Sequence, residues 1–378
     1  MAKPVGSRCN LACEYCYYSK SSAPNGASAD PKRMSDELLE LFIRQYIEAS
    51  EGPEVQVVWH GGEPTLAGLD FFFRAVELQK RYLPSGWSFR NNLQTNGILL
   101  DRKWCEFIAR EHFDVGLSID GSSGVHDTYR KDHGGKGSWQ NAVAAIKLLK
   151  AHGVEPDLLC TVTREAADAP LEVYRALRDL DTGWIQFIPI VRKSGSMPGS
   201  TPGSMPGSGV TPDSVSASGY GDFLCAIFDE WAQNDIGRLD VQLFAEAAHV
   251  WAGGAAGLCW MAPTCGRAII VEKDGGVYSC DHYVYPEYRI GDIQSSHLRD
   301  LVELPVQNSF GNNKRDLLPF ECRTCPWLSV CNGGCPKDRF VKAEGGELNH
   351  LCSGLKKFFA HAHPITMRIL QLARQTIR

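Results

Sequence analysis

Short apolar runs alternate with amphipathic stretches through the first half of the chain, and this alternation limits the fold more than any other feature. The apolar runs, which predict buried strands, lie at residues 55–59, 89–94, 115–119, 157–162 and 184–190. The amphipathic stretches, which predict helices, lie at residues 35–50, 69–82, 102–112, 139–152 and 171–180. Strand–helix alternation is typical of right-handed βαβ units around a parallel sheet. With a short first strand at residues 2–5, we predict an α/β fold built as a partial (β/α)6 TIM-type barrel, with its active site at the carboxyl ends of the strands.

Cysteine is the unusual component of the sequence, with 14 in 378 residues. Residues 1–8 lack the apolar core of a signal peptide, so we expect a cytoplasmic location. In a reducing cytosol, clustered cysteines indicate metal ligation or catalysis rather than a disulfide framework.

Charge and hydropathy exclude two classes of partner. The formal net charge of −5 gives no reason to expect a nucleic-acid partner. No apolar run approaches the length of about 18 residues that a membrane span needs, so we expect no membrane association.

Cys9, Cys13 and Cys16 form a C-x3-C-x2-C motif directly after the first predicted strand. Three thiolates ligate three irons of a [4Fe–4S] cube and leave one iron open, and that iron can chelate the amino and carboxylate groups of S-adenosylmethionine. The alternatives are a zinc site, for which a fourth nearby ligand is missing, or incidental thiols. The position at the carboxyl end of a barrel strand favours the cluster.

Further motifs follow the next strands. Residues 60–64 (HGGEP) contain two glycines that allow a close backbone approach, and Glu63 could accept hydrogen bonds from an ammonium group. Residues 94–97 (QTNG) and 118–121 (SIDG) end the following strands. Arg130 could clamp a carboxylate bidentately; its alternative is a surface ion pair.

Together these motifs resemble the radical S-adenosylmethionine superfamily. By that resemblance the S-adenosylmethionine contacts fall on a set of residues at the strand ends: Tyr15, Gly62, Ser118, Arg130 and Val191.

The last third of the chain carries a second set of cysteines, enough for two sites of four thiolates each. They are Cys259, Cys265, Cys280, Cys322, Cys325, Cys331, Cys335 and Cys352. Zinc is the alternative for C-x2-C pairs. The arrangement resembles the SPASM domain, a module with two auxiliary iron–sulfur clusters. That resemblance implies one [4Fe–4S] cluster on Cys259, Cys265, Cys280 and Cys335, and another on Cys322, Cys325, Cys331 and Cys352, hence three clusters in the chain.

Cys105, Cys160 and Cys225 remain, each within an apolar helix or strand pattern. We predict that they are buried structural thiols.

Nearly the whole chain resembles the anaerobic sulfatase-maturating enzymes, through segments such as residues 91–107, 158–180 and 280–293. This implies that a radical derived from S-adenosylmethionine oxidises a Cys or Ser of an unfolded or nascent sulfatase to formylglycine. The resemblance makes Asp281 the general base; the plain alternative is a turn cap. It also implies a small flavodoxin or ferredoxin as electron donor, and it places Tyr18 beside the radical, where a packed core tyrosine is the alternative.

Two other functions stay open. One is a related enzyme that installs a thioether or carbon–carbon crosslink in a ribosomal peptide. The other is a non-catalytic zinc or iron–sulfur scaffold that binds partners through its cysteine-rich end.

The domain boundaries follow from composition. We predict a barrel at residues 1–193, a flexible Pro/Gly/Ser-rich segment at 194–218, a helical connector at 219–258, the SPASM domain at 259–354 and a C-terminal helix at 355–378 with a break near Pro364.

Overall fold

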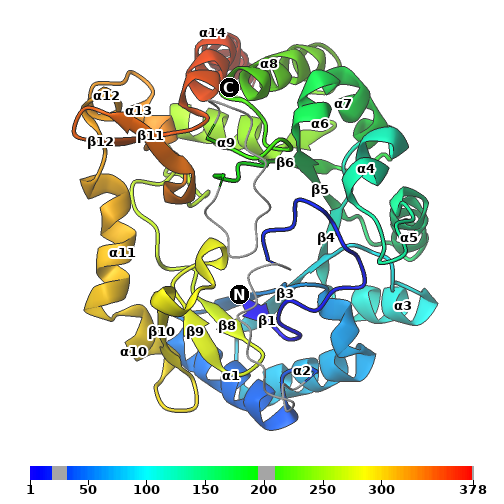
Figure 1. The fold of residues 1–378 in the computed structure, drawn as a ribbon. Coiled ribbons are helices and arrows are strands. Elements are labelled where there is room, and N and C mark those ends of the chain that lie inside the picture. The colour runs from blue at the N-terminus through cyan, green and yellow to red at the C-terminus, as the bar shows by residue number, and fades with distance from the viewer. Residues whose placement is uncertain (19–31, 195–208, 377–378) are drawn as a thin grey trace. The chain divides into compact units, whose positions relative to one another are not determined.

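The computed structural model describes residues 1–18, 32–194 and 209–376, and its chain packs into two units (Figure 1). The first unit contains residues Met1–Ser118, His126–Asp157 and Gly266–Phe310, and the second contains Ile119–Val125, Leu158–Cys265 and Gly311–Arg378. Each unit therefore combines segments that lie far apart in the sequence.

The first unit contains a sheet in the order β10-β9-β8-β1-β2-β3-β4. Its strands are β1 (Ala2–Lys3), β2 (Glu54–Trp59), β3 (Ser88–Thr95), β4 (Asp114–Ser118), β8 (Ile270–Glu272), β9 (Gly276–Tyr278) and β10 (Arg289–Asp292). Its helices are α1 (Asp36–Ala49), α2 (Leu69–Tyr82), α3 (Arg102–Arg110), α5 (Trp139–Ala151) and α10 (Leu298–Val302), while α4 (Ser123–Tyr129) and α11 (Pro305–Asp316) cross between the units. Strands β1 to β4 and β8 pair in parallel where they meet, which confirms the predicted α/β class.

Apolar periodicity explains these elements. Strand β2 alternates exposed and buried residues and places Trp59 in the core, where its ring meets Phe71 and Phe72 of α2 edge-on at 5.9 and 5.7 Å between centroids. Helix α3 ends two residues earlier than predicted, because His112 has a φ of 53° and interrupts the helix.

Strand β8 joins the first unit beside β1, although 267 positions separate Ala2 from Ile269 in the sequence. Ala2 pairs with Val271 and Lys3 with Glu272, in parallel, and Figure 1 shows β8 next to β1. Strands β9 and β10 continue the sheet as antiparallel neighbours. The turn after β9, which holds Cys280 and Asp281, is thereby fixed relative to the start of the chain.

The second unit contains the parallel strands β5 (Asp157–Val162), β6 (Trp184–Pro189) and β7 (Asp240–Val241) and the antiparallel pair β11 (Arg339–Ala343) and β12 (Gly346–Asn349). Its helices are α6 (Arg164–Asp168), α7 (Pro170–Arg178), α8 (Ala217–Asn234), α9 (Gln242–Trp251), α12 (Phe320–Arg323), α13 (Leu328–Cys331) and α14 (Cys352–Thr376). The sequence predicts β5, β6 and one helix over α7, but neither β7 nor α6.

Helices α8 and α14 cross closely at two glycines. A methyl group on Gly354 would lie 1.9 Å from the carbonyl oxygen of Ala217, and one on Gly221 would lie 2.8 Å from the Cα of Gly354. The predicted break at Pro364 is wrong, because α14 continues through it. The buried Phe358 and Phe359 anchor the preceding turns, which offsets the hydrogen bond that proline removes.

The Pro/Gly/Ser-rich segment predicted at residues 194–218 falls largely on residues 195–208, outside the described residues. Its flanks are held together: Lys193 pairs with Val210, and the Ser194 amide donates to the Gly209 carbonyl at 2.9 Å. The two flanks therefore lie side by side.

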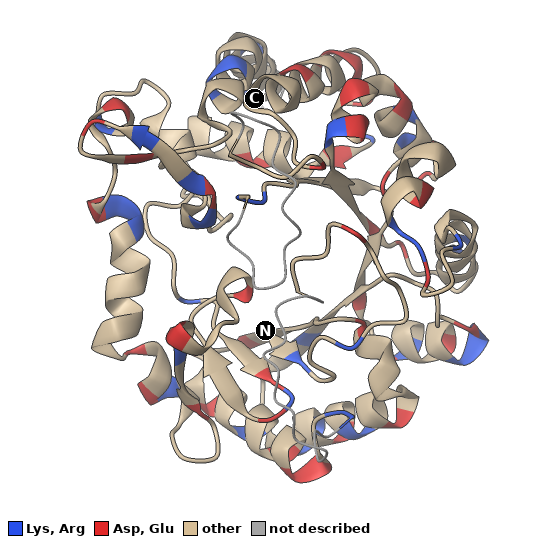
Figure 2. Ribbon diagram, viewed as in Figure 1, with Lys and Arg blue, Asp and Glu red and all other residues tan. Residues whose placement is uncertain are grey.

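Acidic and basic residues are interspersed along the outer helices (Figure 2), in keeping with the small net charge of −5. Among the helices of the described residues, none combines the length and apolarity of a membrane span.

Candidate active site

The three-cysteine loop follows β1 and is held against residues 129–132. The amide of Ala12 donates to the Lys131 carbonyl at 2.7 Å, and that of Glu14 donates to the Tyr129 carbonyl at 3.2 Å. This pairing brings the loop next to Arg130, whose contact with S-adenosylmethionine stays a prediction.

The Cys9 thiol lies in a polar setting at the end of β3. It accepts a hydrogen bond from the Leu11 amide at 3.4 Å and a weaker one from the Asn96 side chain at 3.7 Å. Burial raises the pKa of Cys9 to about 12, so a bound metal must supply the free energy of deprotonation. Asn96 belongs to the QTNG motif, which therefore supports the cysteine loop directly.

In the HGGEP segment, the Glu63 carboxylate is hydrogen-bonded by neighbouring residues of the chain. Glu63 is 1% exposed and accepts hydrogen bonds from the Thr65 and Thr95 hydroxyls at 2.6 and 2.8 Å and from the Asn96 amide at 2.8 Å. Burial raises its pKa. Glu63 therefore joins the ends of β2 and β3, and its hydrogen bond to an ammonium group stays a prediction.

Gly62 permits a close approach, but to the chain itself. A methyl group there would lie 2.0 Å from the Arg8 carbonyl oxygen, and the Gly62 amide donates to the Gly6 carbonyl at 2.8 Å. The glycine thus lets the cysteine loop pack on the end of β2. Its contact with S-adenosylmethionine stays a prediction.

Arg130 is 8% exposed, so the alternative of a surface ion pair is wrong. Its guanidinium carbon lies 5.5 Å from the centre of the Tyr15 ring. Ser118, at the end of β4, accepts a hydrogen bond from Gln94 at 3.3 Å. Tyr15, Ser118 and Arg130 all belong to the first unit, whereas Val191 lies buried after β6 in the second.

Asp281 forms an ion pair with Lys3, with 2.6 Å between the carboxylate oxygen and Nζ, and accepts a hydrogen bond from the Tyr17 hydroxyl. Burial raises the pKa of Asp281, but Lys3, His60 and His282 outweigh it and hold the pKa well below its usual value. Burial, and then the Asp281 carboxylate, raise the pKa of Tyr17. Asp281 is therefore ionised and tied to the residue that follows Cys16.

Lys3 and Tyr17 were not identified from the sequence. Lys3 is fully buried, and a single lysine inside an apolar strand was the available signal for it. Its Nζ also lies 3.4 Å from the centre of the Tyr18 ring. Tyr18 is 5% exposed and donates to Glu272 at 2.5 Å, as the packed-core alternative predicts.

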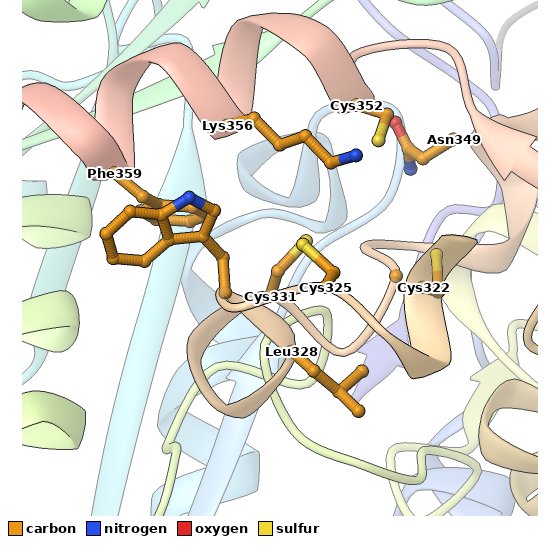
Figure 3. A pocket seen from close by; sticks show the side chains of 10 residues that line it. Cys322, Cys325, Leu328, Cys331, Asn349, Cys352, Lys356 and Phe359 are labelled. Atoms are coloured by element: carbon orange, nitrogen blue, oxygen red, sulfur yellow. The ribbon is translucent and has the colours of Figure 1, made fainter. Parts of the chain in front are cut away.

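Four thiols of the second unit line one cavity: those of Cys322, Cys325, Cys331 and Cys352. Figure 3 shows them facing the cavity from α12, the turn before α13, the end of α13 and the start of α14, with Lys356 directed toward Cys352. The donor set and the cavity fit a [4Fe–4S] cluster.

Three cysteines predicted for the other auxiliary site, Cys259, Cys265 and Cys335, belong to the second unit. Cys265 and Cys335 each lie close enough to Cys259 for a thiolate there to raise their pKa values, although burial is the larger cause. Cys280 belongs to the first unit, and its place in this site stays a prediction. Within the described residues no group of three or more His, Cys, Asp or Glu side chains is arranged to hold a single metal ion.

The three remaining thiols differ in burial. Cys105 and Cys160 are fully buried, as predicted, whereas Cys225 is only half-buried. Cys225 lies on α8, toward the margin of its buried face.

Comparisons with known proteins agree with this site. Residues 4–175 match the radical SAM superfamily, and residues 259–326 match the SPASM iron–sulfur cluster-binding domain. The chain is 43% identical to a serine-type anaerobic sulfatase-maturating enzyme of Bacteroides thetaiotaomicron, over 96% of this chain and 89% of the relative. It is 33% identical to a cysteine-type enzyme of Clostridium perfringens, over 96% of each chain.

A solved structure described as native anSMEcpe with bound AdoMet and Cp18Cys peptide superposes with a TM-score of 0.87 and 32% identity, over 98% of both chains. The matched domains, the cysteine loop and the full-length similarity lead to one assignment. The chain is a radical SAM enzyme and belongs to the family of anaerobic sulfatase-maturating enzymes.

Proposed function

We propose that the chain oxidises a Cys or Ser side chain of an unfolded or nascent sulfatase to Cα-formylglycine, using S-adenosylmethionine and three [4Fe–4S] clusters. The observation that carries this proposal is the hydrogen bond between Tyr17 and Asp281. Tyr17 directly follows Cys16, and Asp281 directly follows Cys280. A candidate base thus lies beside the residues that hold the first cluster.

The first cluster and its cosubstrate each need ligands from the chain. Cys9, Cys13 and Cys16 hold the cluster, and Arg130 binds the methionine carboxylate. Tyr15, Gly62, Ser118 and Val191 complete the cosubstrate site. When bound and reduced, the cluster and S-adenosylmethionine supply a 5′-deoxyadenosyl radical, which takes a hydrogen atom from Cβ of the target residue.

Asp281 acts as the base. Loss of the Cβ hydrogen makes the neighbouring thiol or hydroxyl more acidic, so a carboxylate of low pKa can accept its proton. Lys3 keeps this carboxylate ionised before the reaction. The proton goes to Asp281 and one electron leaves the substrate, giving an aldehyde from Ser or a thioaldehyde from Cys; water converts the thioaldehyde to the aldehyde with release of hydrogen sulfide.

Two further sets of thiolates would hold auxiliary clusters, which when bound could accept the electron from the substrate. Cys259, Cys265, Cys280 and Cys335 ligate one cluster, and Cys322, Cys325, Cys331 and Cys352 ligate the other. Thiolate ligation at every iron suits electron transfer. A small flavodoxin or ferredoxin in the cytoplasm supplies the electron that starts each turnover.

The test is an anaerobic assay with two peptides that carry a sulfatase motif and differ only in Cys or Ser at the target. Formylglycine lowers the mass of the Cys peptide by about 18 Da and that of the Ser peptide by about 2 Da. The serine-type relative has the higher identity, so we expect product from the Ser peptide. A hydrazine probe identifies the aldehyde and separates it from a crosslink of the same mass change. Cleavage of S-adenosylmethionine with no aldehyde from either peptide refutes the proposal.

A further inference from the structure

Arg339, the first residue of β11, binds the turn between Cys331 and Cys335. Its Nε donates to the Gly333 carbonyl at 2.9 Å, and its Nη2 donates to the carbonyls of Asn332 and Gly334 at 2.8 and 3.2 Å. A planar guanidinium with several N–H groups can bind successive carbonyls in this way, whereas a lysine ammonium cannot match the geometry.

This turn depends on an external donor. Asn332, Gly333 and Gly334 all have positive φ, at 47°, 72° and 66°, so their carbonyls follow no helical or strand pattern. Gly333 and Gly334 are buried, and a buried carbonyl without a partner is costly. Arg339 satisfies these groups and thereby fixes the spacing between the thiols of Cys331 and Cys335.

Lys314 is a second cation in the same region. It is 1% exposed, and its Nζ donates to the carbonyl of Ala262, in the loop between Cys259 and Cys265. Its own carbonyl accepts from Nη1 of Arg339 at 2.6 Å. The two side chains therefore connect the Cys259–Cys265 loop, the end of α11 and the Cys331–Cys335 turn.

The surrounding thiols explain why two cations can be placed here. Burial and then the charge of Arg339 lower the pKa of Lys314 to about 8, while thiolates at Cys265 and Cys259 act in the opposite sense. Arg339 likewise interacts with Cys265 and Cys335 of one site and with Cys322 and Cys331 of the other. The negative thiolates of the two auxiliary sites offset the free-energy cost of burying these cations.

We propose that Arg339, together with Lys314, is a positioning residue for electron transfer between the two auxiliary sites. It fixes the turn that gives one thiolate to each site, and the two cations raise the reduction potentials of both clusters. This rests on the proposed function, because the division of Cys331 and Cys335 between two clusters comes from the family resemblance. Fixed positive charge stabilises the reduced, more negative form of a cluster, so an electron from the substrate enters one auxiliary cluster and passes to the other.

The test measures auxiliary reduction potentials in the reconstituted full-length enzyme, by redox titration followed with electron paramagnetic resonance. Arg339→Gln and Lys314→Met should each lower a potential by about 59 mV, which is tenfold in the equilibrium constant of a one-electron couple. Arg339→Lys keeps the charge, so its reduction potentials should stay near those of the wild type. Its paramagnetic resonance signals should broaden, because lysine cannot bind the three carbonyls of the turn. Arg315→Gln is the control: it removes an exposed charge from α11, the helix that carries Lys314, and should leave both reduction potentials unchanged.

Unchanged potentials in Lys314→Met and Arg339→Gln, or an equal shift in Arg315→Gln, overturn the proposal. If Arg339→Gln loses auxiliary iron, Lys314→Met decides, because it leaves every contact of Arg339 with the turn in place. The peptide assay separates the two proposals. If the wild type makes the aldehyde but the variants have unshifted reduction potentials, this inference alone is refuted. If the potentials shift but the wild type makes no aldehyde, the proposed reaction alone is refuted.

Discussion

At the scale of single residues, the proposed reaction depends on a carboxylate that the fold keeps charged. Asp281 is paired with the buried Lys3 and hydrogen-bonded by Tyr17. The sequence identified Asp281 through a family resemblance, but it did not reveal either partner. A lone lysine or tyrosine carries no spacing signal, and the contacts become visible only when β8 pairs with β1.

Asp281→Asn should separate cosubstrate cleavage from substrate oxidation. The amide keeps the shape of the side chain but cannot accept a proton, and loss of a general base typically costs 10²- to 10⁴-fold, so we expect about that reduction in formylglycine. Iron content and 5′-deoxyadenosine release should persist. Mass spectrometry of the peptide measures formylglycine, and chromatography measures the released 5′-deoxyadenosine. Glu287→Gln, which alters an exposed carboxylate in the same unit, is the matched control, and full product formation by Asp281→Asn removes it from its role.

Lys3→Met should destabilise the protein in a way that depends on pH. In the wild type, the depressed pKa of Asp281 stabilises the fold above the unfolded-state pKa of about 3.9, and this is lost as the pH falls through the lower folded-state value. Removing Lys3 leaves a mostly buried charge without its partner, at a cost of about 3 kcal/mol. The pKa of Asp281 then rises, so the deficit is largest at neutral pH and shrinks as the pH falls.

Thermal unfolding of both proteins from pH 5.5 to 8 measures this deficit. Lys80→Met is the control, because Lys80 forms an exposed pair with Glu111 and should cost less than about 1 kcal/mol at every pH. A deficit for Lys3→Met that does not vary with pH contradicts the role assigned to the ion pair.

At the scale of helices and strands, sequence periodicity located the elements that have a strong pattern. Strands β2 to β6 and helices α1, α2 and α5 lie where the apolar runs and amphipathic stretches predict them. Strands β7 and β8 have two and three residues, too few for a period to be visible. Their pairing is decided by distant partners, which is why the position of Asp281 beside the cysteine loop could not be predicted from spacing.

Gly354→Ala tests the crossing of α8 and α14. The new methyl group would lie 1.9 Å from the Ala217 carbonyl oxygen, so one helix must move, at a cost of about 1–3 kcal/mol. Because Cys352 begins α14, iron bound in the cavity shown in Figure 3 should fall as well. Gly183→Ala is the control, since a methyl group there meets nothing within 4 Å. An unchanged melting temperature for Gly354→Ala shows that the crossing is looser than described.

At the scale of the whole molecule, chain order and packing divide the protein differently. Sequence composition groups residues 259–354 as one cysteine-rich domain, and that boundary stays a prediction. Packing assigns residues 266–310 to the unit that contains the start of the chain. Composition cannot reveal such an exchange, because it depends on which short strands pair. The cysteine count, in contrast, predicts the metal content of the whole chain without any structure.

Replacing Cys9, Cys13 and Cys16 together with Ala should remove one cluster and leave two. Iron should fall by about four atoms per chain, and cleavage of S-adenosylmethionine should stop, because no other predicted cluster has an iron without a thiolate. The control replaces Cys105, Cys160 and Cys225 with Ala, which removes the same number of thiols. Its iron should equal that of the wild type, because two of those thiols are fully buried in the core and the third lies on α8. Iron analysis and chromatography of 5′-deoxyadenosine measure both proteins. If the Cys9, Cys13 and Cys16 variant still cleaves the cosubstrate, the radical chemistry resides elsewhere in the chain. If the control loses iron, the assignment of the cluster ligands is wrong.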